Sequence, residues 1–180
     1  EIQNLTSLTA LSIGNNMMTS LPRELILLTK LKDLHVESAQ LISPSPVIQT
    51  KGTNATLDYL RTVERASISG TLDLTHVGLE AFPPDVGVLS NLTKLKLPDN
   101  HLGALSSDIQ GLASITFLDV SRNKIVTIAE EICNLTALTH LNLDRNLINV
   151  LPFEISACTR LRELITSNNP MVGPPAKVMA

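Results

Sequence analysis

The feature that most constrains this chain is a row of leucines at a fixed interval. Leu72, Leu95, Leu118, Leu141 and Leu164 follow one another every 23 residues, and Leu11 and Leu34 have the same spacing. Self-similarity at such a period indicates a repeat architecture, in which one coil cannot bury its own apolar edge and stacked coils share a core. Only 2% of the residues are aromatic, so this core must be aliphatic.

Within one period the fixed residues follow the order leucine-x-x-leucine-x-leucine-x-x-asparagine-x-leucine, as in residues 92–102. The apolar-x-apolar step predicts a short strand, because alternate side chains of a strand point to opposite faces. The expected strands begin at 11, 34, 72, 95, 118 and 141, with a weaker one at 164. The pattern predicts an α/β fold: a right-handed solenoid with a concave parallel β-sheet, interrupted by one helical insertion.

The asparagine after each strand is predicted to be structural. It is present as Asn16, Asn100, Asn123, Asn146 and Asn169, and is replaced by Ala39 and Val77 in two coils. A buried amide has two donor hydrogens and an acceptor oxygen, so it can satisfy backbone groups of its own coil and of the next.

The period fails between Leu34 and Leu72, where the step is one coil plus 15 residues. Ser45 before Pro46 is typical of a helix start, and Gly52 indicates a break between two helices. The apolar spacing from 48 to 63 predicts a helix that closes the first coils; the alternative is an amphipathic helix free to bind a partner. We predict a first repeat block over 1–46, a helical connector or closing helix over 47–66, and a second repeat block over 67–180.

The two ends of the chain also carry repeat signals. Residues 169–178 line up with residues 39–48, as if a second closing segment began there, and residues 1–2 correspond to the middle of a coil. Solenoids normally have polar-faced terminal caps. We therefore expect the chain to be part of a longer polypeptide.

The Leu-Pro-x-x-Ile form at 151–155, with its variant at 21–25, resembles the intracellular leucine-rich repeat proteins with 23-residue coils. The segment from 44 to 61 is similar to a closing helix in several of these. They include plant Ras-group-related repeat proteins, Roco GTPases and leucine-rich repeat-containing protein 40, which it resembles most because coils resume after the helix. The resemblance implies a protein-interaction scaffold, often joined to another domain. None of the GTPase, kinase or ligase motifs of the multidomain members occurs in these residues.

Composition excludes several classes of partner. The net charge of −3 gives no reason to expect nucleic acid or an anionic membrane, and no apolar run reaches the roughly 18 residues of a membrane span. The first four residues lack the features of a signal peptide.

Two cysteines, Cys133 and Cys158, favour a reducing compartment over a disulfide framework, so a cytoplasmic location is predicted. Asn-x-Thr sites, at Asn4, Asn54, Asn91 and Asn134, keep an extracellular receptor domain as an alternative.

No reaction is predicted from the sequence. There is no Gly-rich phosphate loop, zinc pattern or Gly-x-Ser-x-Gly elbow, so we expect no enzyme activity, no catalytic residues, no cofactor and no metal. A metal site at His140 would need three or four convergent ligands. An open sheet face is also too wet for acid–base chemistry, which needs paired groups in a water-poor pocket.

The outward strand positions carry the functional hypothesis. Equivalent residues of neighbouring strands form columns across the concave face. Phe117 is one of four aromatic residues and is expected in such a column between Lys94 and His140, with Arg122 and Arg145 nearby. Aromatic and arginine side chains are typical of an interface centre. The predicted protein-binding residues are Lys94, Lys96, Phe117, Asp119, Arg122, His140, Asn142 and Arg145. Alternatively, Phe117 leans on its own sheet and binds nothing.

The sequence thus predicts a scaffold that binds a protein partner, of unspecified identity, through the concave face of its solenoid. The alternative is a regulatory repeat region of a larger multidomain enzyme, a GTPase, kinase or ubiquitin ligase, whose catalysis lies outside these residues.

Overall fold

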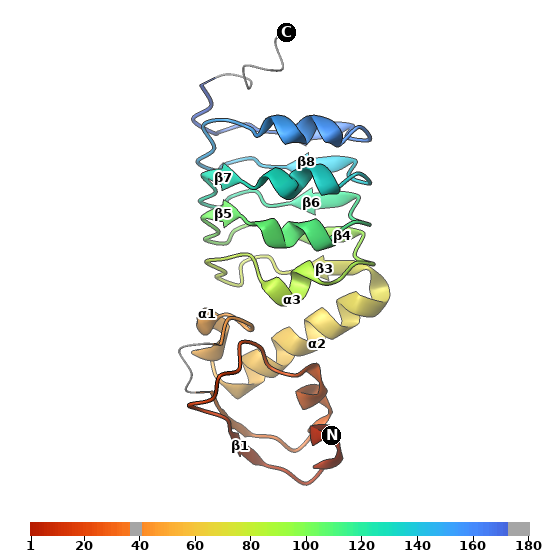
Figure 1. The fold of residues 1–180 in the computed structure, drawn as a ribbon. Coiled ribbons are helices and arrows are strands. Elements are labelled where there is room, and N and C mark those ends of the chain that lie inside the picture. The colour runs from red at the N-terminus through yellow and green to blue at the C-terminus, as the bar shows by residue number, and fades with distance from the viewer. Residues whose placement is uncertain (37–40, 173–180) are drawn as a thin grey trace. The chain divides into compact units, whose positions relative to one another are not determined.

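The computed structural model describes residues 1–36 and 41–172, which form two units, Glu1–Arg65 and Ala66–Ala180. Unit 1 and unit 2 are the names used for them below. Ala39 and the segment from residue 173 onward, on which sequence predictions fall, lie outside the described residues. Figure 1 shows short strands and helices that recur along the chain.

Unit 1 contains two repeat strands and the start of the long helix. In chain order its elements are η1 (Ile2–Asn4), β1 (Ala10–Ser12), η2 (Arg23–Leu27), β2 (Asp33–His35), α1 (Pro46–Gln49) and α2 (Thr53–Ser69), where η marks a 3-10 helix. Strands β1 and β2 pair in parallel with Leu11 opposite Leu34. The register therefore equals the 23-residue period.

The helical insertion in unit 1 is attached to the coils through the start of α2. Gly52, with a φ of 93°, separates α1 from α2 at the predicted break. The Thr53 hydroxyl accepts a hydrogen bond of 2.8 Å from the backbone N–H of Leu34. Leu57, Leu60 and Val63 along the next turns are at most 2% exposed. These apolar side chains of the helix are therefore buried, whereas Ile68 near its end is 82% exposed.

Unit 2 is a regular stack of coils with a five-stranded parallel sheet in the order β3-β4-β6-β8-β9. These strands are β3 (Thr71–Asp73), β4 (Lys94–Lys96), β6 (Phe117–Asp119), β8 (His140–Asn142) and β9 (Glu163–Ile165). A second, two-stranded sheet pairs β5 (Ala104–Leu105) with β7 (Thr127–Ile128). The central leucines of successive strands lie opposite one another, from Leu72 to Leu164. The predicted α/β leucine-rich repeat solenoid is confirmed.

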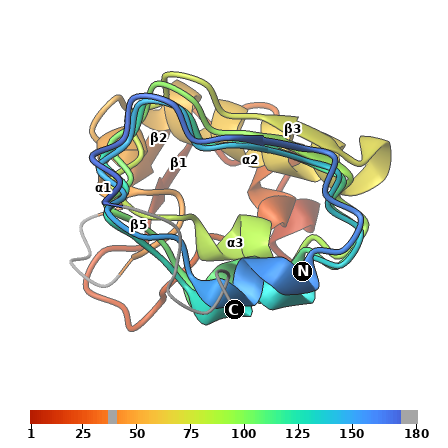
Figure 2. The ribbon, with the colours of Figure 1, turned by 90° about the horizontal axis from the view of Figure 1, so that it is seen from above.

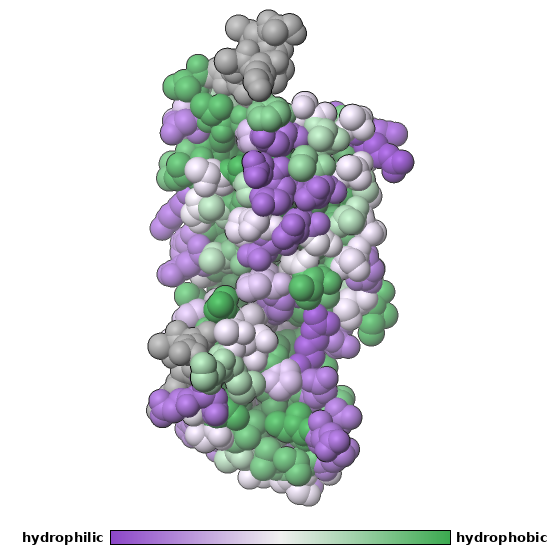
Figure 3. All heavy atoms as spheres, in the orientation of Figure 1, coloured by the Kyte–Doolittle hydropathy of each residue, from purple (hydrophilic) through white to green (hydrophobic). Residues whose placement is uncertain are grey.

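Short helices return the chain on the other side of the core of unit 2: α3 (Pro84–Gly87), η3 (Ser107–Gly111), η4 (Glu130–Asn134) and η5 (Phe153–Ala157). Figure 2 shows the strands and these helices on opposite sides of the interior. Figure 3 shows many hydrophilic side chains on the helical side of unit 2. Acidic residues lie in the first turn of every one of these helices. Negative charge there interacts favourably with the positive end of the helix dipole.

Two columns of side chains tie the coils of unit 2 together. The Asn100 oxygen accepts from the N–H groups of Val77, Gly78 and Leu79, while its amide nitrogen donates to Leu74, Leu97 and Pro98 carbonyls. Asn123, Asn146 and Asn169 likewise each accept from one N–H and donate to carbonyls of their own coil and of the preceding one. The second column consists of threonines: Thr93, Thr116 and Thr139 each donate to a carbonyl oxygen of the preceding coil. This threonine ladder was not predicted from the sequence.

Candidate functional site

The candidate site is the solvent side of the five-stranded sheet in unit 2, called the sheet face below. Each strand contributes an outward residue on either side of its buried leucine, and a third follows at the turn after the strand. The sheet face consists of Thr71, Asp73, His76, Lys94, Lys96, Asp99, Phe117, Asp119, Arg122, His140, Asn142, Arg145, Glu163, Ile165 and Asn168. Register pairs place the strand residues in two columns, as the 23-residue period predicts. The turn residues follow at the same 23-residue spacing and are called the third column.

Phe117 is half-buried at the centre of the first column, and Leu118 next to it turns into the core with 1% exposure. Lys94 places its ammonium 4.8 Å from the centroid of the Phe117 ring. On the other side the His140 ring lies 6.0 Å away, centroid to centroid, with 33° between the ring planes. The ring therefore leans on its sheet neighbours but stays outside the hydrophobic interior.

His140 is held in one orientation by the threonine ladder. Its Nδ1 lies 2.8 Å from the Thr139 hydroxyl oxygen. That hydroxyl donates its one hydrogen to the carbonyl of Thr116, so it accepts from His140 Nδ1–H. Nε2 is then directed toward the Glu163 carboxylate at 3.7 Å, which becomes an ion pair only when Nε2 carries a proton. This fixed ring forms one wall beside Phe117.

Side chains of the second column lie at the surface and also accept hydrogen bonds from the turns that follow their strands. Asp73, Asp119 and Asn142 each accept a hydrogen bond from the backbone N–H two residues later. This local bond is the Asx turn that favours Asp and Asn at such positions. Asp119 and Asn142, which we predicted as binding residues, thus use one side-chain oxygen in forming their own turns. This role was not predicted from the sequence, although the recurrence of Asp and Asn in the column indicates it.

The third column has a backbone conformation that the sequence analysis did not anticipate. Its described members have φ between 53° and 58°, the left-handed region: Asn15 in unit 1, and His76, Asp99, Arg122, Arg145 and Asn168 in unit 2. This region is unfavourable for residues with a Cβ, least so for Asn and Asp. The position directly before the fixed asparagine, often Asn or Asp, is the signal that could have revealed it. Arg122 pairs with Asp99 at 3.6 Å, and Arg145 pairs with Asp144 at 3.5 Å.

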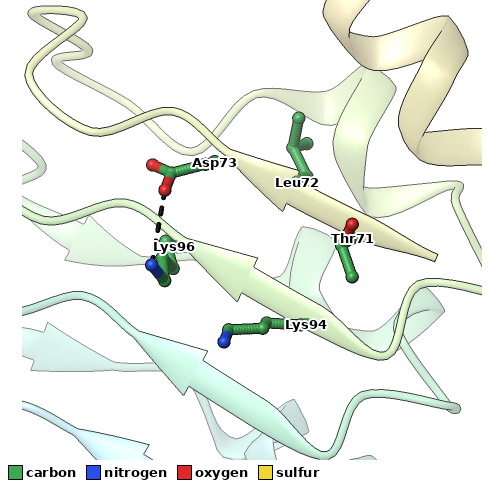
Figure 4. Close-up of a pocket in the computed structure, with 5 residues that line it drawn as sticks. All are labelled: Thr71, Leu72, Asp73, Lys94 and Lys96. Carbon is green, nitrogen blue, oxygen red and sulfur yellow. Dashed lines mark ion pairs between the residues drawn. The ribbon is translucent and has the colours of Figure 1, made fainter. Parts of the chain in front are cut away.

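A shallow pocket of about 350 Å³ lies on the sheet face at β3 and β4. It is lined by Thr71, Leu72, Asp73, Lys94 and Lys96, and Figure 4 shows the Asp73 carboxylate directed toward the Lys96 ammonium, 3.5 Å away. The Thr75 hydroxyl, its N–H and Lys96 hold the pKa of the Asp73 carboxyl below its ordinary value of 3.8, against an opposing effect of burial. Asp73 is thus a fixed anion on one side of the pocket.

Residues 1–36 and 41–172 contain no group of three His, Cys, Asp or Glu side chains that could hold a metal ion. No helix in the same ranges is both long enough and apolar enough to cross a membrane. Both cysteines are free thiols; Cys158 is buried, which raises the pKa of its thiol, and it donates to the Ile132 carbonyl at 3.3 Å.

Comparisons with known proteins agree with this geometry. Residues 70–125 match the family model described as leucine rich repeat. A leucine-rich repeat protein of Leptospira interrogans has 28% identity and a TM-score of 0.58, over 98% of this chain and 46% of its own. An internalin of Listeria monocytogenes has 22% identity and a TM-score of 0.53, over 96% of this chain and 45% of its own.

This chain therefore spans about half the length of each of these two proteins. A search of curated proteins gave no match. The three subfamilies that the closing helix resembles stay a prediction, since none of these matches belongs to them by its description. Period, register and structural similarity together establish that this chain has the fold of a leucine-rich repeat protein.

Proposed function

We propose that this chain is a protein-interaction scaffold that binds a protein partner through the sheet face. The leucine-rich repeat match over residues 70–125 and the similarity to solved leucine-rich repeat structures support an interaction role. A cytoplasmic location and a place beside further domains stay predictions.

The observation that carries the proposal is the setting of Phe117. An aromatic ring at the solvent side of a sheet has a large apolar area to offer a partner. Lys94 on one side and His140 on the other restrict the ring, and His140 is itself fixed by Thr139. A side chain that is ordered before binding loses little conformational freedom on binding, so more of its contact energy appears as affinity. Aromatic residues at the centre of an interface are typical hot spots.

Arginines near this ring extend the proposed interface. Arg122 and Arg145 are exposed at the ends of β6 and β8, and each pairs with one neighbouring carboxylate. Exposed pairs of this kind contribute at most about 1 kcal/mol, so a partner can replace them at little cost. The arginines can then donate to the partner while the sheet stays intact.

The test is affinity capture from a native extract with the whole chain, followed by a binding measurement with the captured partner. We expect Phe117→Ala to weaken binding by about 2 kcal/mol or more, which is about 30-fold, and Arg145→Glu to weaken it further by charge reversal. Val88→Ala is the matched control, because Val88 is 71% exposed at the end of α3, on the helical side. A folded Phe117→Ala chain that binds the partner as well as the control would refute the proposal.

A further inference from the structure

The pocket beside Phe117 has an uneven charge distribution. Lys94 and Lys96 are alternate residues of β4, so both side chains point to the solvent side of the sheet, and both line the pocket. Asp73 is the only carboxylate among the residues that line it. The pocket therefore brings together two ammonium groups and one carboxylate.

The two lysines differ in how their charge is balanced. Lys96 pairs with Asp73 at 3.5 Å and has Asp119 as its register partner on the other side. Lys94 lies between Thr71 and Phe117 in the register, and no carboxylate pairs with it in the described part of the chain. The Lys94 ammonium instead contacts the Phe117 ring, 4.8 Å from its centroid. An exposed cation–π contact contributes only roughly 0.5–1 kcal/mol, so the ammonium can still bind an anionic group.

Resting on the proposed function, we infer that this pocket takes the carboxylate of an Asp or Glu side chain in an extended, acidic segment of the partner protein. The carboxylate binds Lys94, while an apolar side chain within two residues of it packs on Phe117. The spacing supports this arrangement, because neighbouring strands are about 4.8 Å apart and alternate residues of an extended segment are about 6.6 Å apart. Five strands span roughly 19 Å, which about six extended residues can cross.

Charge complementarity selects an acidic occupant over a basic one. A basic side chain in this pocket would meet Lys94 and Lys96, and Asp73 is already bound to Thr75 and Lys96. A carboxylate instead meets an ammonium that lacks an anionic partner within residues 1–36 and 41–172. The same distribution predicts that binding weakens as salt concentration rises.

The probe is a phage-displayed library of random 12-residue peptides, selected in parallel on the wild-type chain, on Lys94→Glu and on Lys124→Glu. Lys124 is an exposed lysine outside the sheet face and makes the matched charge control. We expect the wild type and Lys124→Glu to select peptides with Asp or Glu within two residues of an aromatic or aliphatic residue. Lys94→Glu should lose that preference. The Kd of one synthetic selected peptide should rise at least tenfold with Lys94→Glu and stay unchanged with Lys124→Glu.

Each outcome decides between the two proposals. If selected peptides lack acidic residues but lose binding to a folded Phe117→Ala chain, the inference about the pocket is wrong and the proposed function stands. If the wild type selects no peptide, or if peptide binding is indifferent to Lys94→Glu, the inference about the pocket is wrong. The proposed function is wrong only if the captured partner binds the folded Phe117→Ala chain as tightly as the Val88→Ala control. Circular dichroism of each variant establishes that a lost signal does not come from unfolding.

Discussion

Units 1 and 2 are built from the same repeat, yet their fixed residues are buried to very different extents. Asn16 in unit 1 is exposed and donates to the carbonyls of Ile13 and Gly14 in its own coil. Asn100 and Asn123 in unit 2 are 3% and 8% exposed and bond across coils. The same residue type at the same position of the repeat therefore lies at the surface in unit 1 and in the interior in unit 2.

The strand leucines follow the same division. Leu11 and Leu34 are half-buried in the two-stranded sheet of unit 1. Leu95, with a strand on either side, is fully buried, whereas Leu164 on the last strand of the sheet is 39% exposed. Leu72, on the opposite edge strand β3, is only 3% exposed, so the burial of this leucine depends on what packs around each coil and not on its position in the repeat alone. A repeat motif specifies a shape, and stacking supplies most of its stability.

The largest expected effect is a difference in stability between two variants, Asn100→Ala in unit 2 and Asn16→Ala in unit 1. Asn100→Ala removes an amide that satisfies three N–H groups and three carbonyls, several of them buried, so it should lower the free energy of unfolding of unit 2 by about 3 kcal/mol or more. Asn16→Ala, at an exposed position, should cost about 1 kcal/mol or less. Urea unfolding with hydrogen exchange to assign each unit measures both. Equal losses would show that the comparison of burial does not predict stability.

A smaller effect tests how closely coils approach in unit 2. A Cβ built at Gly111 would lie 2.0 Å from the carbonyl oxygen of Gly87 in the preceding coil, and one built at Gly87 would lie 2.5 Å from that of Asp108. Because backbone atoms must move to make room, Gly111→Ala should cost about 1–3 kcal/mol. Thermal unfolding measures the loss.

Gly103→Ala is the matched control within the same coil, because a Cβ there meets nothing within 4 Å. It should leave stability unchanged or raise it slightly, by less than about 1 kcal/mol, through a less flexible unfolded chain. Similar losses for both glycines would mean that coil spacing in unit 2 adjusts easily.

These contrasts show what the sequence could and could not predict. The 23-residue period alone places Lys94, Phe117 and His140 side by side, because equal spacing fixes the register of parallel strands. The left-handed backbone of Arg122 and Arg145 carries no signal in residue type, since arginine has no preference for that region. The position before the fixed asparagine indicates a left-handed conformation only when the equivalent residues of all coils are compared with one another.

Contacts between the backbones of neighbouring coils could not be predicted from the sequence either. The approach of Gly111 to Gly87 depends on the path of the short helices at Pro84–Gly87 and Ser107–Gly111, which differ in type from one coil to the next. The aliphatic pattern specifies that these segments return to the core but not how tightly they turn. The threonine ladder was missed for a related reason: a threonine hydroxyl beside a strand can bond to water or to a backbone carbonyl, and the sequence does not distinguish the two.

The smallest expected effect is a dependence of the stability of unit 2 on acidic pH, caused by Asp73. The equivalent positions in unit 1 are Ser12 and His35, which carry no carboxylate. Since folding lowers the pKa of the Asp73 carboxyl, mainly through the Thr75 hydroxyl, its stabilising contribution is complete above the ordinary value of 3.8 and is lost as the pH falls through the lower folded value. Asp73→Asn should therefore reduce the loss of stability on acidification below about pH 4. Thr75→Val should bring the pKa of Asp73, followed by carboxyl-carbon NMR, back toward 3.8. An unchanged titration in Thr75→Val would contradict this assignment and leave the Thr75 backbone N–H and Lys96 as the groups that lower the pKa of the carboxyl.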